Sequence, residues 1–424
     1  MRSSLRHLAP RIVFSIIGET DMRSSRLICT LVLFALTALT ASSLHAQRNH
    51  EECTTAIISG EATPDGRPIL WKNRDTDQLS NRVVYVKETP FSYLALVNAE
   101  DSSGRRAWSG LNAVGFAIMN SVAYNLPQGS GEEEDLEGII MADALRTCAT
   151  VRDFEEYLKH NLGPNLGSRA NFGVIDAQAG AALFEVYNLG YKRFDARDFP
   201  EKYIINTNFS QSGRADAGMG YLRFDRATEI FKSAPPRGIT VEFILQVAAR
   251  DLGHPLLHNT PRDEWKKLPT GTPYWIHTNH TVNRPSTAGT VVIHGIGESE
   301  EPIKPTMWTI LGEPVTSIAV PLWVDAGETP LEMRGSTAAP ICDEAKRLKD
   351  LLRPLKGSDR HEYADVTKLD NNAGSGWLPL LLKTEREILA AAAKLEQTIP
   401  SPARCREFEG EAAARVFKTL KSIH

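Results

Sequence analysis

Cysteine is scarce in this sequence, with five residues among 424, at positions 29, 53, 148, 342 and 405. Thiols this few and this widely spaced are not the dense disulfide framework that holds small secreted domains together. An excess of charge is absent too, because 48 basic and 52 acidic residues leave a formal net charge of −4. This balance argues against nucleic acid or an anionic membrane as a partner, and we expect an ordinary globular chain.

Long apolar runs are also rare. One such run spans residues 27–39. It follows the positively charged segment 22–26 (Met-Arg-Ser-Ser-Arg) and precedes a segment rich in small residues that ends at Ala46. It is shorter than the roughly 20 residues that a membrane-spanning helix needs, so a membrane anchor is the less favoured interpretation. A positive start, an apolar run and a small residue before the cut are typical of a secretory signal peptide. We therefore expect an N-terminal extension plus signal peptide at residues 1–46, with translation starting at Met22 and cleavage after about Ala46.

Strand-like and helix-like segments alternate between residue 53 and about residue 330. Strands followed by helix pairs and then by more strands predict sheets whose outer faces are covered by helices, an α/β fold. The expected strands are residues 54–59, 68–72, 82–87, 93–97, 115–122, 171–176, 181–187, 203–207, 290–294 and 317–322, and the expected helices are 136–148, 151–160, 222–232 and 241–249.

The character of the chain changes after residue 330. Helical periodicity dominates there, with helices expected at residues 338–355, 378–397 and 403–421. We therefore divide the mature chain into a main α/β domain at residues 53–330 and a C-terminal helical extension at 331–424.

Cys53 opens the first expected strand directly after the hexapeptide 47–52 that follows the signal cut. A nucleophile at a chain start can use its own α-amino group as general base, because the pKa of that group, roughly 7.7–8.0, lies near working pH. Residues 47–52 would then be a short propeptide, removed when the Cys53 thiol attacks the carbonyl of Glu52. The alternative is a small apolar cysteine on a buried strand.

The surroundings of Cys53 resemble a known family. Cys53-Thr54-Thr55, an Asp-Gly turn at residues 65–66 and the segment 71–75 (Trp-Lys-Asn-Arg-Asp) are similar to the start of the N-terminal nucleophile hydrolases of the choloylglycine hydrolase and penicillin (isopenicillin N) acyltransferase superfamily. Lys72 stands where this family usually carries arginine. Lysine keeps the positive charge but loses the planar fork that binds a carboxylate through two hydrogen bonds, a function that Arg74 could supply.

The resemblance continues downstream in the family's order. Residues 110–121 are similar to its Gly-x-Asn-x-x-Gly segment and lead to Asn120, residues 205–209 to its Thr-Asn-x-Phe strand end with Asn208, and residues 222–227 to its helix start with Arg223. It covers residues 53–322 and implies a four-layer αββα sandwich, to which the last helices are an extension. It also implies a linear amide hydrolase.

The resemblance assigns a role to each matched residue. Cys53 is the nucleophile, and Asn120 and Asn208 are the donors that stabilise the tetrahedral oxyanion. Asp75 orients the Cys53 ammonium, and Arg223 lowers the pKa of the thiol. Lys72 and Arg74 are supporting residues. Each of these residues also has a structural alternative, such as a strand-end turn for Asn208 or a solvated arginine on a helix face for Arg223.

The implied function is a secreted or periplasmic amidohydrolase. It would cleave a non-peptide carbon–nitrogen bond of an acylated amine or amino acid through a thioester on Cys53. Two alternatives stay open, an acyltransferase similar to penicillin acyltransferase and an inactive protein that binds acylated amines. The expected partner is a small-molecule substrate, neither nucleic acid nor a membrane is expected after signal removal, and a homo-oligomer is the default assumption.

No cofactor or metal is expected. His277 and His280 have the spacing of helical metal ligands, but Pro273 and Pro285 on either side predict a loop or strand and argue against zinc. Pairing of Cys342 with Cys405, on neighbouring expected helices, is left open.

Overall fold

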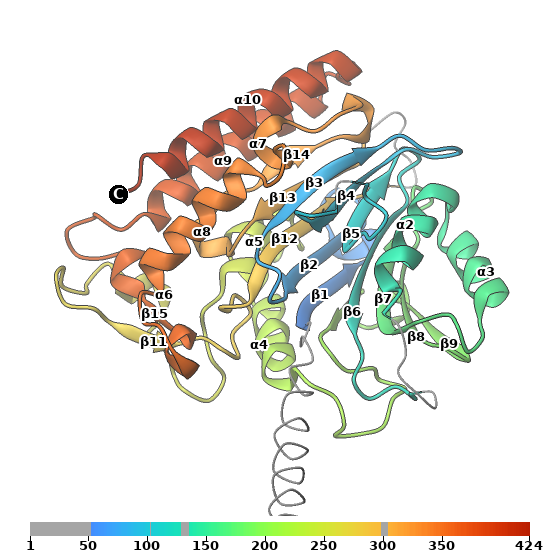
Figure 1. The fold of residues 1–424 in the computed structure, drawn as a ribbon, viewed down its shortest axis with the longest axis horizontal. Helices are drawn as coiled ribbons and strands as arrows, with labels where there is room; N and C mark the ends of the chain where they lie inside the picture. Colours follow the sequence, from blue (N-terminus) through green and yellow to red (C-terminus); the bar gives the residue numbers. More distant parts are fainter. Residues whose placement is uncertain (1–51, 102, 129–134, 298–303) are drawn as a thin grey trace, which may run out of the picture. The chain divides into compact units, whose positions relative to one another are not determined.

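The computed structural model describes residues 52–101, 103–128, 135–297 and 304–424 (Figure 1). The predicted signal peptide at residues 1–46, its start at Met22 and propeptide residues 47–51 lie outside the described residues. Glu51–His424 form one compact unit. Among the described residues, no helix combines the length and the apolar character that crossing a bilayer requires.

Two antiparallel sheets form the centre of this unit. The strands of the six-stranded sheet are, in spatial order, β10 (Tyr203–Asn206), β1 (Glu52–Ile58), β2 (Ile69–Asp75), β12 (Thr287–His294), β13 (Thr306–Leu311) and β14 (Val320–Leu322). The strands of the seven-stranded sheet are β3 (Asn81–Val86), β4 (Tyr93–Asn98), β5 (Ser109–Asn112), β6 (Ala117–Val122), β7 (Arg169–Ile175), β8 (Ala181–Tyr187) and β9 (Gly190–Asp195). A separate pair joins β11 (Trp275–His277) to β15 (Tyr363–Asp365).

Helices cover the outer faces of both sheets (Figure 1). On the seven-stranded sheet lie α2 (Glu137–Thr147) and α3 (Val151–Asn161), the latter begun by a capping box between Thr150 and Asp153. On the six-stranded side lie α4 (Tyr221–Lys232), α5 (Val241–Gln246), α8 (Pro340–Leu352), α9 (Leu378–Glu396) and α10 (Pro402–Lys421), with the short helices α6 (Arg262–Trp265) and α7 (Leu331–Arg334) beside them. The predicted four-layer αββα sandwich is therefore confirmed.

The layers are held by separate apolar contacts. Phe154 of α3 packs edge-on against Phe172 and Phe184 of the seven-stranded sheet. Trp71 of β2 stacks on Phe231 of α4, 5.6 Å between ring centroids. Strands β1 and β2 are buried along their whole length because helices cover one face and the second sheet covers the other.

Helix α9 is tied to the six-stranded side by a fully buried ion pair. Arg250 Nη2 lies 2.8 Å from Glu385 Oε1, and both side chains are 0% exposed. The same guanidinium donates to the Ser317 carbonyl. The Ala319 N–H donates to Glu385 as well, so both members of this ion pair bond the backbone before Val320, and the strand expected at residues 317–322 begins only there, as β14.

Three further expectations need correction. The helix expected at 241–249 ends at Gln246, and Ala248–Arg250 is a 3-10 turn. The helix expected at 338–355 ends at Leu352, since Pro354 disfavours a helical residue before it. Strands β5, β9 and β13 were not predicted at all.

Candidate active site

The hairpin of β1 and β2 presents Cys53. Cys53 pairs with Arg74 of β2, and Lys72 lies two residues from Arg74 on the same face of the sheet. Lys72 reaches Asn120 of β6 in the other sheet, so this face is the one between the sheets. The Cys53 side chain therefore points into the inter-sheet layer, and the residue is 4% exposed while Glu52 still precedes it.

Two predicted residues hold the backbone of Cys53. Its N–H donates to Asn208 Oδ1 at 2.9 Å, and its carbonyl accepts from Arg223 Nη1 at 2.6 Å. Arg223 Nη2 also donates to Asn208 Oδ1 at 2.8 Å, so the two side chains are fixed to each other. The Asn208 amide donates to the Val122 carbonyl. Cys53, Asn208 and Arg223, far apart in the sequence, thus meet in one site.

Gly220 allows Arg223 to take this position. It precedes α4 with φ of +79°, a conformation that residues with a side chain rarely adopt. A Cβ at this position would lie 2.6 Å from Arg223 Nη2 and 2.9 Å from Thr207 Oγ1. A side chain at this position would therefore collide with the guanidinium that binds the Cys53 carbonyl.

Two arginines bind the side chain of Glu52, the residue before the nucleophile. Arg223 Nη2 lies 2.6 Å and Arg284 Nη1 2.5 Å from Glu52 Oε2. We call Arg223 and Arg284 the arginine pair. Burial alone would raise the pKa of the Glu52 carboxyl, but the two guanidinium charges and their hydrogen bonds outweigh it and lower that pKa. Glu52 is therefore ionised at neutral pH.

Asp75 faces the same arginine pair from β2, opposite Glu52 in the strand register. Its Oδ1 accepts from Thr287 Oγ1 at 2.7 Å. Its Oδ2 lies 3.8 Å from Arg223 Nη1 and 4.0 Å from Arg284 Nη1, and it makes no hydrogen bond. Complete burial raises the pKa of this carboxyl to about 6, against the opposing effect of the two arginines. Asp75 thus keeps a free acceptor oxygen beside the chain segment that joins Glu52 to Cys53.

Lys72 and Asn120 belong to a buried polar network between the sheets. Lys72 Nζ donates to Asn120 Oδ1 at 2.7 Å and to the Trp108 carbonyl at 2.8 Å. Asn120 Nδ2 donates in turn to Glu137 Oε2 at 2.7 Å. The network fixes the orientation of the Asn120 amide, whose predicted role as an oxyanion donor stays a prediction.

Arg74 lies over the ring of Trp108, 4.5 Å from its centroid, and donates to Asn81 Oδ1. These contacts hold it at the β2–β3 end of the inter-sheet layer. The carboxylate-binding role suggested for Arg74 stays a prediction. Arg223 and Arg284, for their part, bind the Glu52 carboxylate.

Sequence reasoning missed Arg284, Thr287 and Glu137 as site residues. Arg284 lies between Asn283 and Pro285, which together are typical of a turn. No motif in the sequence connects this segment with Cys53. Thr287 begins β12 beside a β-bulge, three residues before the strand start that was expected. Only the three-dimensional pairing of β12 with β2 brings Arg284 and Thr287 to Asp75.

The remaining cysteines and histidines were considered above for a disulfide and for a metal site. None of the four cysteines in the described part of the chain forms a disulfide, so the pairing of Cys342 with Cys405 that was left open does not occur. His277 ends strand β11 and lies 2.8 Å from Glu362, and its ring centroid is 6.4 Å from that of His280. Within the described residues, no group of three or more His, Cys, Asp or Glu side chains is arranged to hold a metal ion.

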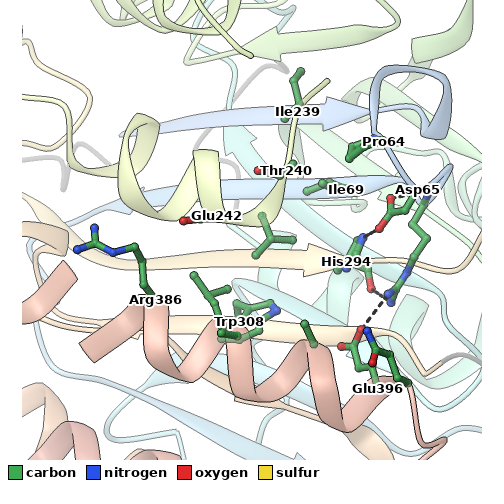
Figure 2. Close-up of a pocket in the computed structure, with 16 residues that line it drawn as sticks. Pro64, Asp65, Ile69, Ile239, Thr240, Glu242, His294, Trp308, Arg386 and Glu396 are labelled. Atoms are coloured by element: carbon green, nitrogen blue, oxygen red, sulfur yellow. Dashed lines mark hydrogen bonds and ion pairs between the residues drawn. The ribbon is translucent and has the colours of Figure 1, made fainter. Parts of the chain in front are cut away.

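A separate cavity of about 670 Å³ lies between α5 and α9 (Figure 2). Its floor includes Ile69 and Trp308, and ion pairs between Asp65 and His294 and between Arg67 and Glu396 lie at one end. Ile69 and Asp75 are opposite ends of β2, so the cavity lies about 20 Å along the sheet from Asp75. Its lining includes no cysteine, and Cys53 remains the better candidate for the reacting group.

A scan against models of known protein families and a search of curated proteins gave no match. Among solved structures, the Caenorhabditis elegans ortholog of N-acylethanolamine-hydrolyzing acid amidase is 14% identical with a TM-score of 0.38, over 57% of this chain and 92% of that chain. A conjugated bile acid hydrolase from Clostridium perfringens is 12% identical with a TM-score of 0.36, over 61% and 89%. Penicillin V acylase from Agrobacterium tumefaciens is 13% identical with a TM-score of 0.34, over 64% and 86%. At these identities and TM-scores, the likenesses concern the backbone and carry no argument about activity.

Proposed function

We propose that this protein is a secreted cysteine amidohydrolase that activates itself by cutting the Glu52–Cys53 bond and then hydrolyses a linear, non-peptide amide of an acylated amine. The observation that supports the proposal is the set of side-chain hydrogen bonds that hold the two residues at this bond. Asn208 and Arg223 hold the nitrogen and the carbonyl of Cys53, the arginine pair holds Glu52, and Asp75 offers a free acceptor beside them.

Self-cleavage would proceed by an acyl shift. Cys53 Sγ attacks the Glu52 carbonyl carbon, the C–N bond breaks, and the new α-amine takes the thiol proton. Water then hydrolyses the thioester and releases the segment that ends in Glu52. The Cys53 nitrogen, which already donates to Asn208 Oδ1, becomes a terminal amine one residue from the position at which β1 pairs with Asp75.

Substrate hydrolysis would repeat this chemistry. The Cys53 α-amine accepts the thiol proton, the sulfur attacks the amide carbonyl, and the leaving amine departs with that proton. Water completes the cycle by hydrolysing the thioester. Ionised Asp75 would orient the ammonium that forms transiently, in the role that a third group has in catalytic triads. Buried Arg223 would favour the thiolate by its charge.

A thiol-directed acylating probe tests the nucleophile. The probe should label Cys53 in the purified protein, and a Cys53→Ala variant should neither be labelled nor release amine from an amide substrate. Cys148→Ala is the matched control, because Cys148 is equally buried but lies in the helix layer of the other sheet. Equal labelling of wild type and Cys53→Ala would refute the proposal and favour an inactive binding protein.

Product analysis with a competing amine separates hydrolysis from acyl transfer. Export makes transfer from coenzyme A implausible as the working reaction, because coenzyme A is a cytoplasmic metabolite. We therefore expect free acid as the main product even with an added amine. A dominant amide product with the added amine would replace the hydrolase by an acyltransferase.

A further inference from the structure

We infer that the mature enzyme selects amides whose acyl group carries its own carboxylate, and that the arginine pair, Arg223 and Arg284, is the subsite for this carboxylate. The inference rests on the proposed function, since it concerns the space that Glu52 leaves when it is cut off. The glutaryl and α-glutamyl groups are the acyl groups that fit best.

Cleavage leaves the arginine pair short of negative charge. Before cleavage, the guanidiniums of Arg223 and Arg284 face two carboxylates, Glu52 and Asp75. Cleavage removes Glu52 and adds the α-amino group of Cys53. The two buried guanidiniums then lose the carboxylate that hydrogen-bonds both of them and face only Asp75, which hydrogen-bonds neither, and a protonated amine increases the imbalance. Uncompensated buried charge is costly, so the vacated place favours an anion.

The arginine pair also has N–H donors that are left without acceptors. The side chains of Arg223 and Arg284 are 1% and 8% exposed, and the Nε–H of each has no partner even while Glu52 is bound. When Glu52 leaves, Arg223 Nη2 and Arg284 Nη1 each lose an acceptor at 2.6 and 2.5 Å. A planar carboxylate is the group that arginine forks bind best.

The two thioesters formed on Cys53 indicate that the carboxylate lies on the acyl side of the substrate. Self-cleavage puts the Glu52 acyl group on Cys53 Sγ, and catalysis puts the substrate acyl group on the same sulfur. In both thioesters the atoms beyond the carbonyl carbon extend from the same point. In Glu52 three carbon atoms separate the carbonyl carbon from the carboxylate carbon, as they do in a glutaryl group. The propeptide residue is thus a template for the acyl group.

The architecture around Arg284 keeps this subsite in place. Arg284 Nη2 donates to Asn279 Oδ1 at 2.7 Å, and Lys349 of α8 donates to the carbonyl of the next residue, Pro285. Thr287, which bonds Asp75, also accepts from the Arg284 backbone N–H. Arg284 is therefore held independently of Glu52 and should stay in place after cleavage.

The test compares anilides that share one leaving amine. Glutaryl anilide and pentanoyl anilide have the same chain length and differ in the terminal carboxylate, and the glutaramic anilide carries a neutral amide there. Charge-assisted hydrogen bonds predict that kcat/KM for glutaryl exceeds that for the other two by roughly 10- to 150-fold. Arg284→Gln should reduce this ratio by about tenfold or more.

Arg193→Gln is the matched control. Arg193 is a partly exposed arginine on β9 of the other sheet that pairs with Asp195 of the same strand and with Glu155 of α3, so its replacement should leave the glutaryl preference at the wild-type value. Glutarate should also bind the mature wild type more tightly than pentanoate in calorimetry, and Arg284→Gln should lose this difference.

The possible outcomes separate the two proposals. Cys53-dependent hydrolysis without a preference for the carboxylate, and without tighter binding of glutarate, overturns the subsite and leaves the amidohydrolase intact. A protein in which Glu52 stays attached to Cys53 and which releases no amine overturns both, because the arginine pair then remains filled.

Discussion

Replacing Asp75 with asparagine should stabilise the precursor at neutral pH while removing a carboxylate that the proposed mechanism needs. Asp75 is fully buried, its Oδ2 has no hydrogen bond, and its pKa is raised to about 6 from 3.8, chiefly by burial. The unfolded chain therefore loses this proton at lower pH than the folded chain does. Stability falls as pH rises from about 4 to about 6, and the whole penalty applies above that range.

The size of the effect follows from the shift. About two pKa units, at roughly 1.4 kcal/mol each, correspond to a penalty on the order of 3 kcal/mol. Asparagine keeps the shape but does not ionise, so Asp75→Asn should raise the free energy of unfolding by about this amount at pH 7.5. At pH 4 most of this difference should disappear, because the carboxyl is then largely protonated in the folded chain.

Urea denaturation in a Cys53→Ala background measures this without interference from cleavage. Asp77→Asn, at an exposed position two residues away, is the control and should change stability by no more than about 0.5 kcal/mol. If Asp75→Asn destabilises the precursor at pH 7.5, the arginine pair favours the ionised carboxylate and the reasoning is refuted. With Cys53 intact, Asp75→Asn should also slow amide hydrolysis by roughly 100-fold or more.

Glu52→Gln should slow cleavage of the Glu52–Cys53 bond by roughly tenfold or more, because it removes a charge-assisted contact with the arginine pair. Its activity per mature chain, by active-site titration, should equal that of wild type, since Glu52 is absent from both; a different value would place Glu52 in the working enzyme. Glu385→Gln should lower the free energy of unfolding by about 3–5 kcal/mol by leaving buried Arg250 without its carboxylate, as urea denaturation would show; a loss below 1 kcal/mol would contradict this. Lys72→Met should cost roughly 1–3 kcal/mol or more, because the Asn120 and Trp108 acceptors lose their donor. An unchanged urea midpoint for Lys72→Met would show that this donor contributes little.

The sequence predicts the layers of this fold better than its irregular strands. The expected strands of both sheets and the helices that cover them are present, because alternation, turn residues and helical periodicity are local signals. Strand β13 (Thr306–Leu311) was missed because both of its faces are buried and its sequence therefore does not alternate. Strand β5 (Ser109–Asn112) was missed because it is only four residues long and includes Gly110, so it is too short to show the alternation from which strands were predicted.

Family resemblance located the part of the site that lies on recognisable segments. Cys53, Asp75, Asn208 and Arg223 meet around one peptide bond. Arg284 could not be found this way, because its contact with Glu52 spans more than 200 residues and depends on the pairing of β12 with β2. The binding of Glu52 by the arginine pair likewise can be recognised only from the side chains that surround it in the structure.

The N-terminal residue and intact mass of the purified protein test the central claim most directly. Wild type should begin at Cys53, and a Cys53→Ala variant should retain residues 47–52. A wild-type chain that still carries Glu52, or a Cys53→Ala chain that is cut at the same bond, would contradict self-cleavage by the Cys53 thiol.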